Sequence, residues 1–273
     1  MKRSLRVLIL GRGKLGVAVA QAARAAGHRV QIASFRSWPP SRPVTAELLI
    51  LAVRDRELEP LAKAMAESGA VRRGTVVVHA AGARASDALE ALRGHADGVA
   101  QLHPMIAFAS TRFAPALAGG HAHVEGDEAA VKLARRFCRS IGLTPRTFSA
   151  LDTVGYHAAA GLVANGAAAL AALGQELLVR SGAPREAVPH LLGPLLRSVA
   201  ENVEALGLPA ALTGPVRRGD AHGLARHLET IRALLPEAAK FYAEAARAQL
   251  PLARTLADAP AEAFDAIESL LRD

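Results

Sequence analysis

Two histidines end hydrophobic runs at places where a side chain could exchange a proton with a bound molecule. His79 ends the short run that starts at Thr75, and His103 begins the triplet His-Pro-Met at the end of the next run. An unperturbed imidazole titrates near neutral pH, so either proton state is accessible during turnover. For each histidine, the alternative is a hydrogen bond to the backbone that fixes a loop. The pattern predicts a proton-transfer site and leaves the reaction open.

Polar residues recur at helical spacing on a long alanine-rich segment. Tyr156 and His157 come first, and His157, Gly161 and Asn165 follow one another at intervals of four. Residues four apart share one side of a helix. A glycine between two polar side chains allows a ligand to approach closely. The alternative is a buried, hydrogen-bonded asparagine together with a histidine in the capping region of the helix. We expect His157 and Asn165 to orient a substrate and Tyr156 to contact it.

A polar loop precedes another predicted helix. It runs from Leu212 to Asp220 with the sequence Leu-Thr-Gly-Pro-Val-Arg-Arg-Gly-Asp. Asp220 is a natural helix N-cap. The guanidinium of Arg218 can bind a carboxylate or a phosphate through charge-assisted hydrogen bonds. We expect Arg218 and Thr213 to bind a small anionic substrate.

A glycine-rich motif near the amino terminus is suited to binding a pyrophosphate. The first glycine of G-x-G-x-x-G permits a tight turn, the second lets the backbone approach the phosphates, and the third allows close packing of helix and strand. Here the motif follows the strand-like run Leu5 to Leu10 and opens a helix, which is the context that the dinucleotide-binding motif requires. The expected cofactor contacts in the motif are Gly11, Arg12, Gly13, Lys14, Leu15 and Gly16.

The residues after the second predicted strand indicate which dinucleotide is preferred. A site specific for NAD usually has Asp or Glu there to bind the ribose hydroxyls. This sequence has Ser34 and Arg36 instead, and a hydroxyl with a guanidinium suits a 2′-phosphate. We therefore predict NADP(H) as the cofactor, with Arg42 as a further phosphate contact. Other expected cofactor contacts, which follow neighbouring strands, are Val53, Arg54 and His79.

Strands and helices alternate in the first half of the chain. Strand-like runs at 5–10, 28–34, 46–53 and 75–79 are separated by helical segments at 15–26 and 58–68 and a loop at 36–43, and 85–92 is helical again. After residue 150 only alanine-rich helical segments follow, at 152–181, 184–206, 221–248 and 259–271. We predict an α/β protein, with an amino-terminal doubly wound Rossmann domain (residues 1–150) and a carboxyl-terminal all-helical domain (residues 151–273).

Composition excludes several classes of protein. The net charge is +8, but only five of the 33 basic residues are lysines and the arginines are scattered along the chain, so no basic stripe for nucleic acid is expected. A single cysteine, Cys138, excludes an internal disulfide and a zinc site built from paired cysteines, and it fits a reducing cytoplasm. We expect no metal site.

The longest apolar stretch is the main argument for a membrane-bound protein. It runs from about Tyr156 to Val179, but Asn165, Gln175 and Glu176 interrupt it. Because polar groups are costly in hydrocarbon, the stretch indicates a buried helix rather than a membrane span. The amino terminus lacks the cleavage site of a signal peptide, and we expect a soluble, cytoplasmic protein.

Several of these motifs resemble one family over nearly the whole chain. They are the glycine motif, Val78-His79-Ala80-Ala81-Gly82-Ala83, Leu102-His103-Pro104-Met105 with Phe108, Tyr156-His157-Ala158-Ala159-Ala160, Thr213-Gly214-Pro215, Arg218-Gly219-Asp220, and His227. The chain resembles Rossmann-like proteins with a carboxyl-terminal domain of unknown function 2520. That family is similar in architecture to pyrroline-5-carboxylate reductase, ketopantoate reductase and the β-hydroxyacid dehydrogenases.

The resemblance implies an NADP-linked reductase, often dimeric through its helical domain. In β-hydroxyacid dehydrogenases a lysine occupies the position of Asn165, so catalysis by that lysine does not carry over. The triplet His103-Pro104-Met105 is similar to one in prephenate dehydrogenases, whose histidine contacts the substrate hydroxyl.

The resulting hypothesis is hydride transfer between NADP(H) and a carbonyl, hydroxyl or imine carbon of a small anionic metabolite. In this hypothesis His103 is the acid or base, His157 and Asn165 orient the substrate, and Arg218 binds its charge. A non-catalytic NADP-binding sensor or regulatory protein is the alternative, because a nucleotide site does not by itself establish catalysis.

Overall fold

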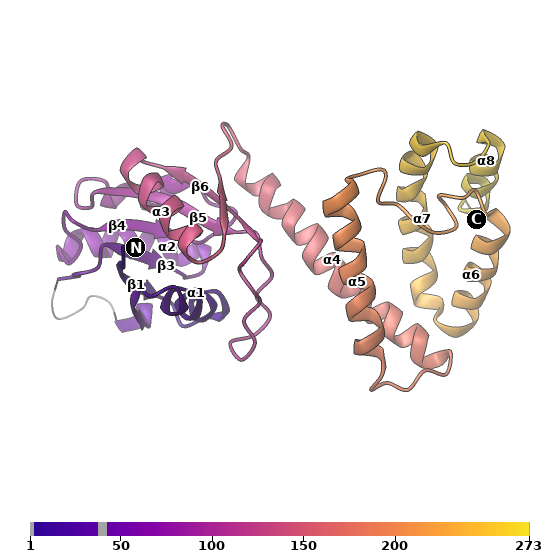
Figure 1. Cartoon of the computed structure of the whole chain (residues 1–273), viewed down its shortest axis with the longest axis horizontal. Helices are drawn as coiled ribbons and strands as arrows, with labels where there is room; N and C mark the ends of the chain where they lie inside the picture. Colours follow the sequence, from indigo (N-terminus) through magenta and orange to yellow (C-terminus); the bar gives the residue numbers. More distant parts are fainter. Residues whose placement is uncertain (1–2, 38–42, 273) are drawn as a thin grey trace. The chain divides into compact units, whose positions relative to one another are not determined.

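The computed structural model describes residues 3–37 and 43–272, in two compact units, Met1–Ala164 and Asn165–Asp273. Figure 1 shows the sheet and helices of the first unit in indigo to magenta and the helices of the second in orange to yellow. The division falls inside a long helix, α4 (Thr153–Arg180), fourteen residues beyond the predicted boundary at 150. The sequence placed the boundary in the turn that precedes this helix.

A seven-stranded sheet forms the centre of the first unit. Its strands are β1 (Arg6–Leu10), β2 (Arg29–Ala33), β3 (Leu48–Leu51), β4 (Val76–His79), β5 (Gly98–Pro104), β6 (His121–Gly126) and β7 (Thr144–Arg146). They lie in the order β2-β1-β3-β4-β5-β6-β7. The first five are parallel, whereas β6 runs antiparallel to β5 and β7 runs parallel to β6. Because the five parallel strands end at the same edge, the residues that follow them share that edge.

Helices cover both faces of this sheet, which confirms the predicted doubly wound α/β class. On one face, α1 (Lys14–Ala25) and α3 (Glu128–Ser140) pack against side chains such as Val7 and Ile9. On the other, α2 (Asp55–Ser68) and the 3₁₀ segment η2 (Ser86–Leu92) pack against side chains such as Leu10 and Leu49. A short 3₁₀ turn, η1 (Phe35–Ser37), follows β2.

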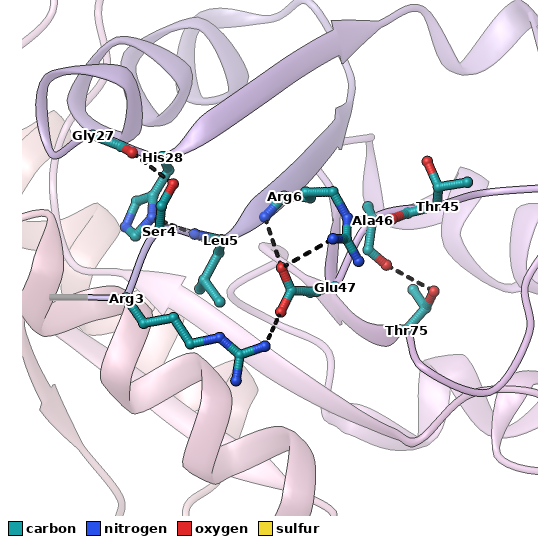
Figure 2. Close-up of polar contacts among 10 residues, drawn as sticks. All are labelled: Arg3, Ser4, Leu5, Arg6, Gly27, His28, Thr45, Ala46, Glu47 and Thr75. Carbon is teal, nitrogen blue, oxygen red and sulfur yellow. Dashed lines mark hydrogen bonds and ion pairs between the residues drawn. The ribbon is translucent and has the colours of Figure 1, made fainter.

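Polar contacts join the amino-terminal ends of the strands, as Figure 2 shows. Glu47 accepts hydrogen bonds from the side chain of Arg3 (2.7 Å) and the backbone of Arg6 (3.1 Å). The backbone N–H of Leu5 donates to Nδ1 of the buried His28 (3.1 Å), so the ring proton lies on Nε2, 2.7 Å from Ser140 Oγ. His28 is therefore held as a neutral imidazole at the edge opposite the glycine motif.

The second unit is helical, as predicted, but its helix boundaries differ from the prediction. After α4 come α5 (Val188–Leu206), α6 (Ala221–Leu234), α7 (Pro236–Leu256) and α8 (Ala261–Leu270). The single predicted helix at 221–248 is two helices, because Leu235 leaves helical geometry (φ −150°, ψ 68°) and Pro236 starts a new helix. Leu224, Leu228 and Leu250 belong to the core that α6, α7 and α8 share.

The prediction of a buried helix at 156–179 is wrong for the isolated chain. α4 contains no buried residue, and Leu162 is 79% exposed. Leu173 and Leu177 are its partly buried positions that pack against Ile231 of the second unit. Among the described helices, α4 is the one that is long and apolar enough to cross a membrane, judged by length and composition only. Contiguous exposed apolar side chains of this kind mark interaction surfaces.

Four buried imidazoles make stability depend on pH. Burial lowers the pKa of His28, His79, His103 and His123 below the ordinary value. The unfolded chain therefore takes up protons before the folded one does, and stability present above the unfolded pKa of about 6.5 is lost as pH falls toward the lowered values. Each imidazole contributes at most about 1.4 kcal/mol per pH unit.

Urea unfolding checks this prediction. We expect a lower free energy of unfolding at about pH 5.5 than at about pH 7.5. His28→Gln can keep both hydrogen bonds and should reduce the slope, whereas His95→Gln, at an exposed position, should not. A stability independent of pH over this range would contradict the neutral assignment of these rings.

Candidate functional site

The glycine motif after β1 has the geometry of a phosphate-binding turn. A Cβ at Gly11 (φ +130°) would collide with the carbonyl of Ala52, and one at Gly16 with the carbonyl of Gly11. At Gly13 nothing lies within 4 Å of the Cβ position. Packing of the protein itself therefore requires glycine at positions 11 and 16, whereas Gly13 borders open space that a phosphate can enter.

The amino terminus of α1 faces this open space. Gly13 is the N-cap and provides no side-chain cap, so the N–H groups of the first turn are free for an anion. Arg12 and Lys14 are exposed beside it, and Leu15 packs against the core. The positive charges of Arg12 and Lys14 and the free N–H groups of α1 therefore lie beside the open space at Gly13.

The contrast between Gly13 and Gly16 gives a matched pair of variants. Gly13→Ala should fold with unchanged thermal stability but lose about tenfold in dinucleotide affinity, because the methyl group occupies space needed by phosphate. Gly16→Ala should lower the melting temperature, because its methyl group meets backbone. Calorimetric titration and thermal unfolding measure the two effects, and unaltered binding by Gly13→Ala would remove the phosphate assignment.

The residues predicted to select NADP follow β2, and two further predicted cofactor contacts follow β3. Ser34 Oγ accepts a hydrogen bond from the backbone N–H of Arg36 (3.3 Å), and the exposed Arg36 side chain forms no ion pair with the described residues. Arg42 lies outside the described residues. Val53 packs against the core after β3, and Arg54 is the exposed N-cap of α2. Ser34 and Arg36 thus offer a hydroxyl and an uncommitted guanidinium at the end of β2.

Three aromatic side chains meet at the end of β5. His103 is 9% exposed, and its ring centre lies 5.9 Å from that of Tyr156 and 5.4 Å from that of His157. Gly82, which follows β4, has no room for a Cβ atom. Such an atom would lie 2.9 Å from His103 Nε2 and would collide with His157 Nδ1. The structure therefore brings His103, Tyr156 and His157 together over a glycine.

The proton state of His103 follows from its contacts. Nδ1 lies 3.0 Å from the carbonyl oxygen of Ala80, which can only accept, so Nδ1 carries the proton. Burial, followed by the charge of His157, lowers the pKa of His103, although the bond to Ala80 and the charge of Asp55 oppose this. At neutral pH, Nε2 therefore offers a lone pair toward Gly82 and can accept a proton or a hydrogen bond.

His79 lies differently from the prediction. It is fully buried, and its Nε2 donates to the carbonyl of Ala85 (2.9 Å). The geometry favours the alternative stated for this residue, a histidine that fixes the loop after β4. Gln101 supports the same loop, because its amide donates to the carbonyl of Ala81 (2.7 Å).

The remaining predicted site residues belong to the second unit. Asn165 is exposed on α4, two turns beyond His157, and Thr213 and Arg218 are exposed in the loop before α6. Arg217, rather than Arg218, holds this loop, through Asp258 (2.6 Å) and the carbonyl of Leu212 (2.7 Å). Asp220 caps α6 by accepting from the backbone of Gly223 (2.8 Å), which confirms the predicted N-cap.

Sequence reasoning missed two residues beside this site. His123 is paired with His103 across β5 and β6, and Phe148 stacks on His123 with ring centres 5.7 Å apart. Polar and apolar residues alternate in His121-Ala122-His123, as they do in a strand, but no other feature of the sequence indicated strand β6. Within residues 3–37 and 43–272, no three His, Cys, Asp or Glu side chains form a group that could hold a metal ion.

Two family models match the chain in order. The Rossmann-like domain matches residues 1–104, and the domain of unknown function DUF2520 matches residues 121–249. No curated protein matches the sequence.

Solved structures share the fold along nearly their whole length. A candidate NADP oxidoreductase from Bacteroides fragilis is 19% identical, with a TM-score of 0.71, and the match covers 91% of this chain and 98% of that one. A pyrroline carboxylate reductase from Plasmodium falciparum, solved with NADP bound, is 14% identical (TM-score 0.56; 92% and 99% covered). An imine reductase from Streptomyces aurantiacus is 17% identical (TM-score 0.53; 98% and 99% covered). At such identities the likeness establishes the fold. The two family matches show that this chain carries a Rossmann-like domain followed by DUF2520, the arrangement that its motifs predicted.

Proposed function

We propose that this chain is an NADP-dependent oxidoreductase that transfers a hydride between NADP(H) and a carbonyl, hydroxyl or imine carbon of a small anionic metabolite. The observation that carries the proposal is one sheet edge with two features: an open phosphate cradle at Gly13 after β1, and the free Nε2 of His103 at the end of β5. β1 and β5 are three strand spacings apart, about 14 Å, which an extended dinucleotide can span.

The residues at this edge fit the cofactor. The glycine motif and the first turn of α1 would hold the pyrophosphate, and Ser34 with Arg36 would bind the 2′-phosphate. The bound nicotinamide would supply or accept the hydride. The likeness to an NADP oxidoreductase and to a reductase solved with NADP supports this choice of cofactor.

His103 would manage the proton at Nε2. In the oxidative direction it takes a proton from a substrate hydroxyl or amine, and in the reductive direction it returns that proton. The lone pair of the neutral ring accepts a hydrogen bond from a substrate hydroxyl or amine, whereas the ring protonated at Nε2 donates to a carbonyl or imine in the reductive direction. His157 and Tyr156 would orient that group. The substrate contacts expected of Asn165, Thr213 and Arg218, which lie in the second unit, stay predictions from the sequence.

Turnover tests the proposal. We would screen small keto acids and cyclic imines for oxidation of NADPH, and the matching hydroxy acids and amines for reduction of NADP⁺. Substrate-dependent turnover that requires NADPH would support the proposal. Tight NADPH binding without turnover on the whole panel would instead support the non-catalytic sensor, which the absence of a lysine at position 165 also favours.

We also propose a homodimer formed through the helical unit. On α5, Leu191, Leu195, Val199 and Val203 recur every fourth residue, and each is about half exposed. These four side chains therefore form a stripe on one side of the helix. The exposed apolar area of the stripe is larger than that of a single apolar residue scattered on a protein surface. A second copy is the simplest cover, because two-fold homo-oligomers are the commonest assemblies. Lipid fits less well, because α4 carries Gln175 and Glu176 and Glu176 pairs with Arg185.

Sedimentation of the purified chain checks the dimer. We expect twice the chain mass of 28.4 kDa, and a monomer when Leu195 and Val199 are both replaced by Glu. Arg197→Glu, on the same exposed helix, is the matched control and should stay dimeric. A monomeric parent chain would exclude the assembly.

A cytoplasmic location completes the proposal. Cys138 is buried and unpaired, and burial raises the pKa of its thiol to about 12, so it is unreactive toward disulfide formation. This fits a chain that folds in a reducing compartment.

A further inference from the structure

His123 is a buried polar residue that the proposed reaction does not use. It lies on β6 directly opposite His103 on β5, so both side chains project from the same face of the sheet. Its side chain is nearly inaccessible, with a relative exposure of 1%. Neither ring nitrogen has a hydrogen-bond partner among the described residues. His103, by contrast, has a partner at Nδ1.

Two unsatisfied nitrogens in one buried ring are costly. A buried donor or acceptor without a partner loses its bond to water and gains nothing in return, so each such group in a native protein calls for an explanation. A phenylalanine at this position would pack against Phe148 without that cost. The polarity of His123 therefore calls for a hydrogen-bond partner, either a neighbouring hydroxyl or an enclosed water.

Tyr156 is the candidate for that partner. Its ring centre lies 5.7 Å from the ring of His123 and 5.9 Å from the ring of His103, so it touches both imidazoles. The tyrosine is half-buried, and no hydrogen bond of its hydroxyl occurs among the described residues. Phe148 stacks nearly parallel on His123, at 8°, and so covers its face and leaves the ring edge as the route to a partner.

We propose that His123 is a positioning residue that binds the hydroxyl of Tyr156, directly or through one enclosed water, and thereby holds Tyr156 against His103. A neutral imidazole has one donor and one acceptor, so it can accept from the phenol and can donate to a phenolate. The bond joins the sheet edge to the start of α4. Its consequence for turnover rests on the proposed function, whereas the bond itself does not.

The composition makes this bond measurable. Tyr156 and Tyr242 are the two tyrosines of the chain, so a Tyr242→Phe background leaves Tyr156 as the single phenol. Burial raises the pKa of Tyr156. His103 on β5 and His123 on β6, whose rings lie beside Tyr156, have lowered pKa values, so both are neutral in the alkaline range where the phenol titrates. The carboxylate of Glu125 on β6 acts on His123. The phenolate absorbance therefore reports Tyr156 alone.

Alkaline titration of three chains in this background tests the proposal. With His123 present, the ring N–H stabilises the phenolate by a charge-assisted bond. His123→Phe should therefore raise the pKa of Tyr156 further, and His123→Asn, whose amide can donate, should restore it toward the parent value. Identical titrations of parent and His123→Phe would overturn the proposal.

A double-mutant cycle tests the same bond between His123 and Tyr156 without the need for alkaline pH. The effects of His123→Phe and Tyr156→Phe on urea unfolding at neutral pH should be non-additive if the two side chains share a bond. Additive effects would contradict it. If no substrate is ever turned over, the proposed function fails, but both measurements still decide the role of His123.

Discussion

Replacing His103 by alanine is expected to lower kcat about 100- to 10,000-fold, the range typical for loss of a general acid or base. The geometry commits Nδ1–H to the carbonyl of Ala80, so Nε2 is the atom left to exchange a proton with substrate. NADPH affinity should change little, because the phosphate cradle lies at β1, three strands away. Steady-state kinetics and a binding titration separate the two quantities.

The pH profile adds a second readout for His103. Because the pKa of this ring is lowered, the oxidative rate should fall only when pH drops below the ordinary titration range of histidine. The exposed His95 supplies the control, and His95→Ala should behave as the parent does. If His103→Ala turns over within about twofold of the parent, His103 is not the general acid or base.

Arg36→Ala should weaken NADPH binding about 100-fold and leave NADH binding unchanged. Hydrogen bonds to charged groups contribute about 1.5–3 kcal/mol, and a guanidinium can place two of them on one phosphate. Arg36 forms no ion pair within the described chain, so no internal partner competes with the 2′-phosphate. Calorimetric titration with both cofactors measures the selectivity directly.

Two variants make the Arg36 result specific. Arg36→Lys keeps the charge but not the bidentate geometry, and should recover part of the affinity. Arg29→Ala removes an exposed arginine from the opposite end of β2 and should change neither affinity. Equal affinities of the parent chain for NADH and NADPH would contradict the assignment of Ser34 and Arg36.

The sequence allowed prediction of the elements with strong local signals. Strand β1, the glycine motif and α1 form one continuous pattern, because each glycine has a separate steric requirement and the flanking residues repeat with the period of their element. The end of β5 was also predictable, since the run ends in the triplet His103-Pro104-Met105. These local patterns predicted that the glycine motif and His103 lie on the same edge of the sheet.

Other features depended on contacts that local patterns do not encode. β6 contains two histidines and a glutamate in six residues, so its hydrophobicity is weak, and its burial comes from pairing with β5. The periodicity of 221–248 continues across Leu235, where backbone geometry ends one helix and Pro236 starts another. The exposure of α4 was unpredictable from its alanine-rich composition, because burial depends on partners.

A calorimetric titration of the purified chain with NADPH and NADH under identical conditions decides whether this chain binds a nicotinamide cofactor and which one. We expect saturable binding of one NADPH per chain in the micromolar range, with NADH markedly weaker. Absence of binding by either dinucleotide would contradict the cofactor assignment and the oxidoreductase function together, and would leave only the fold.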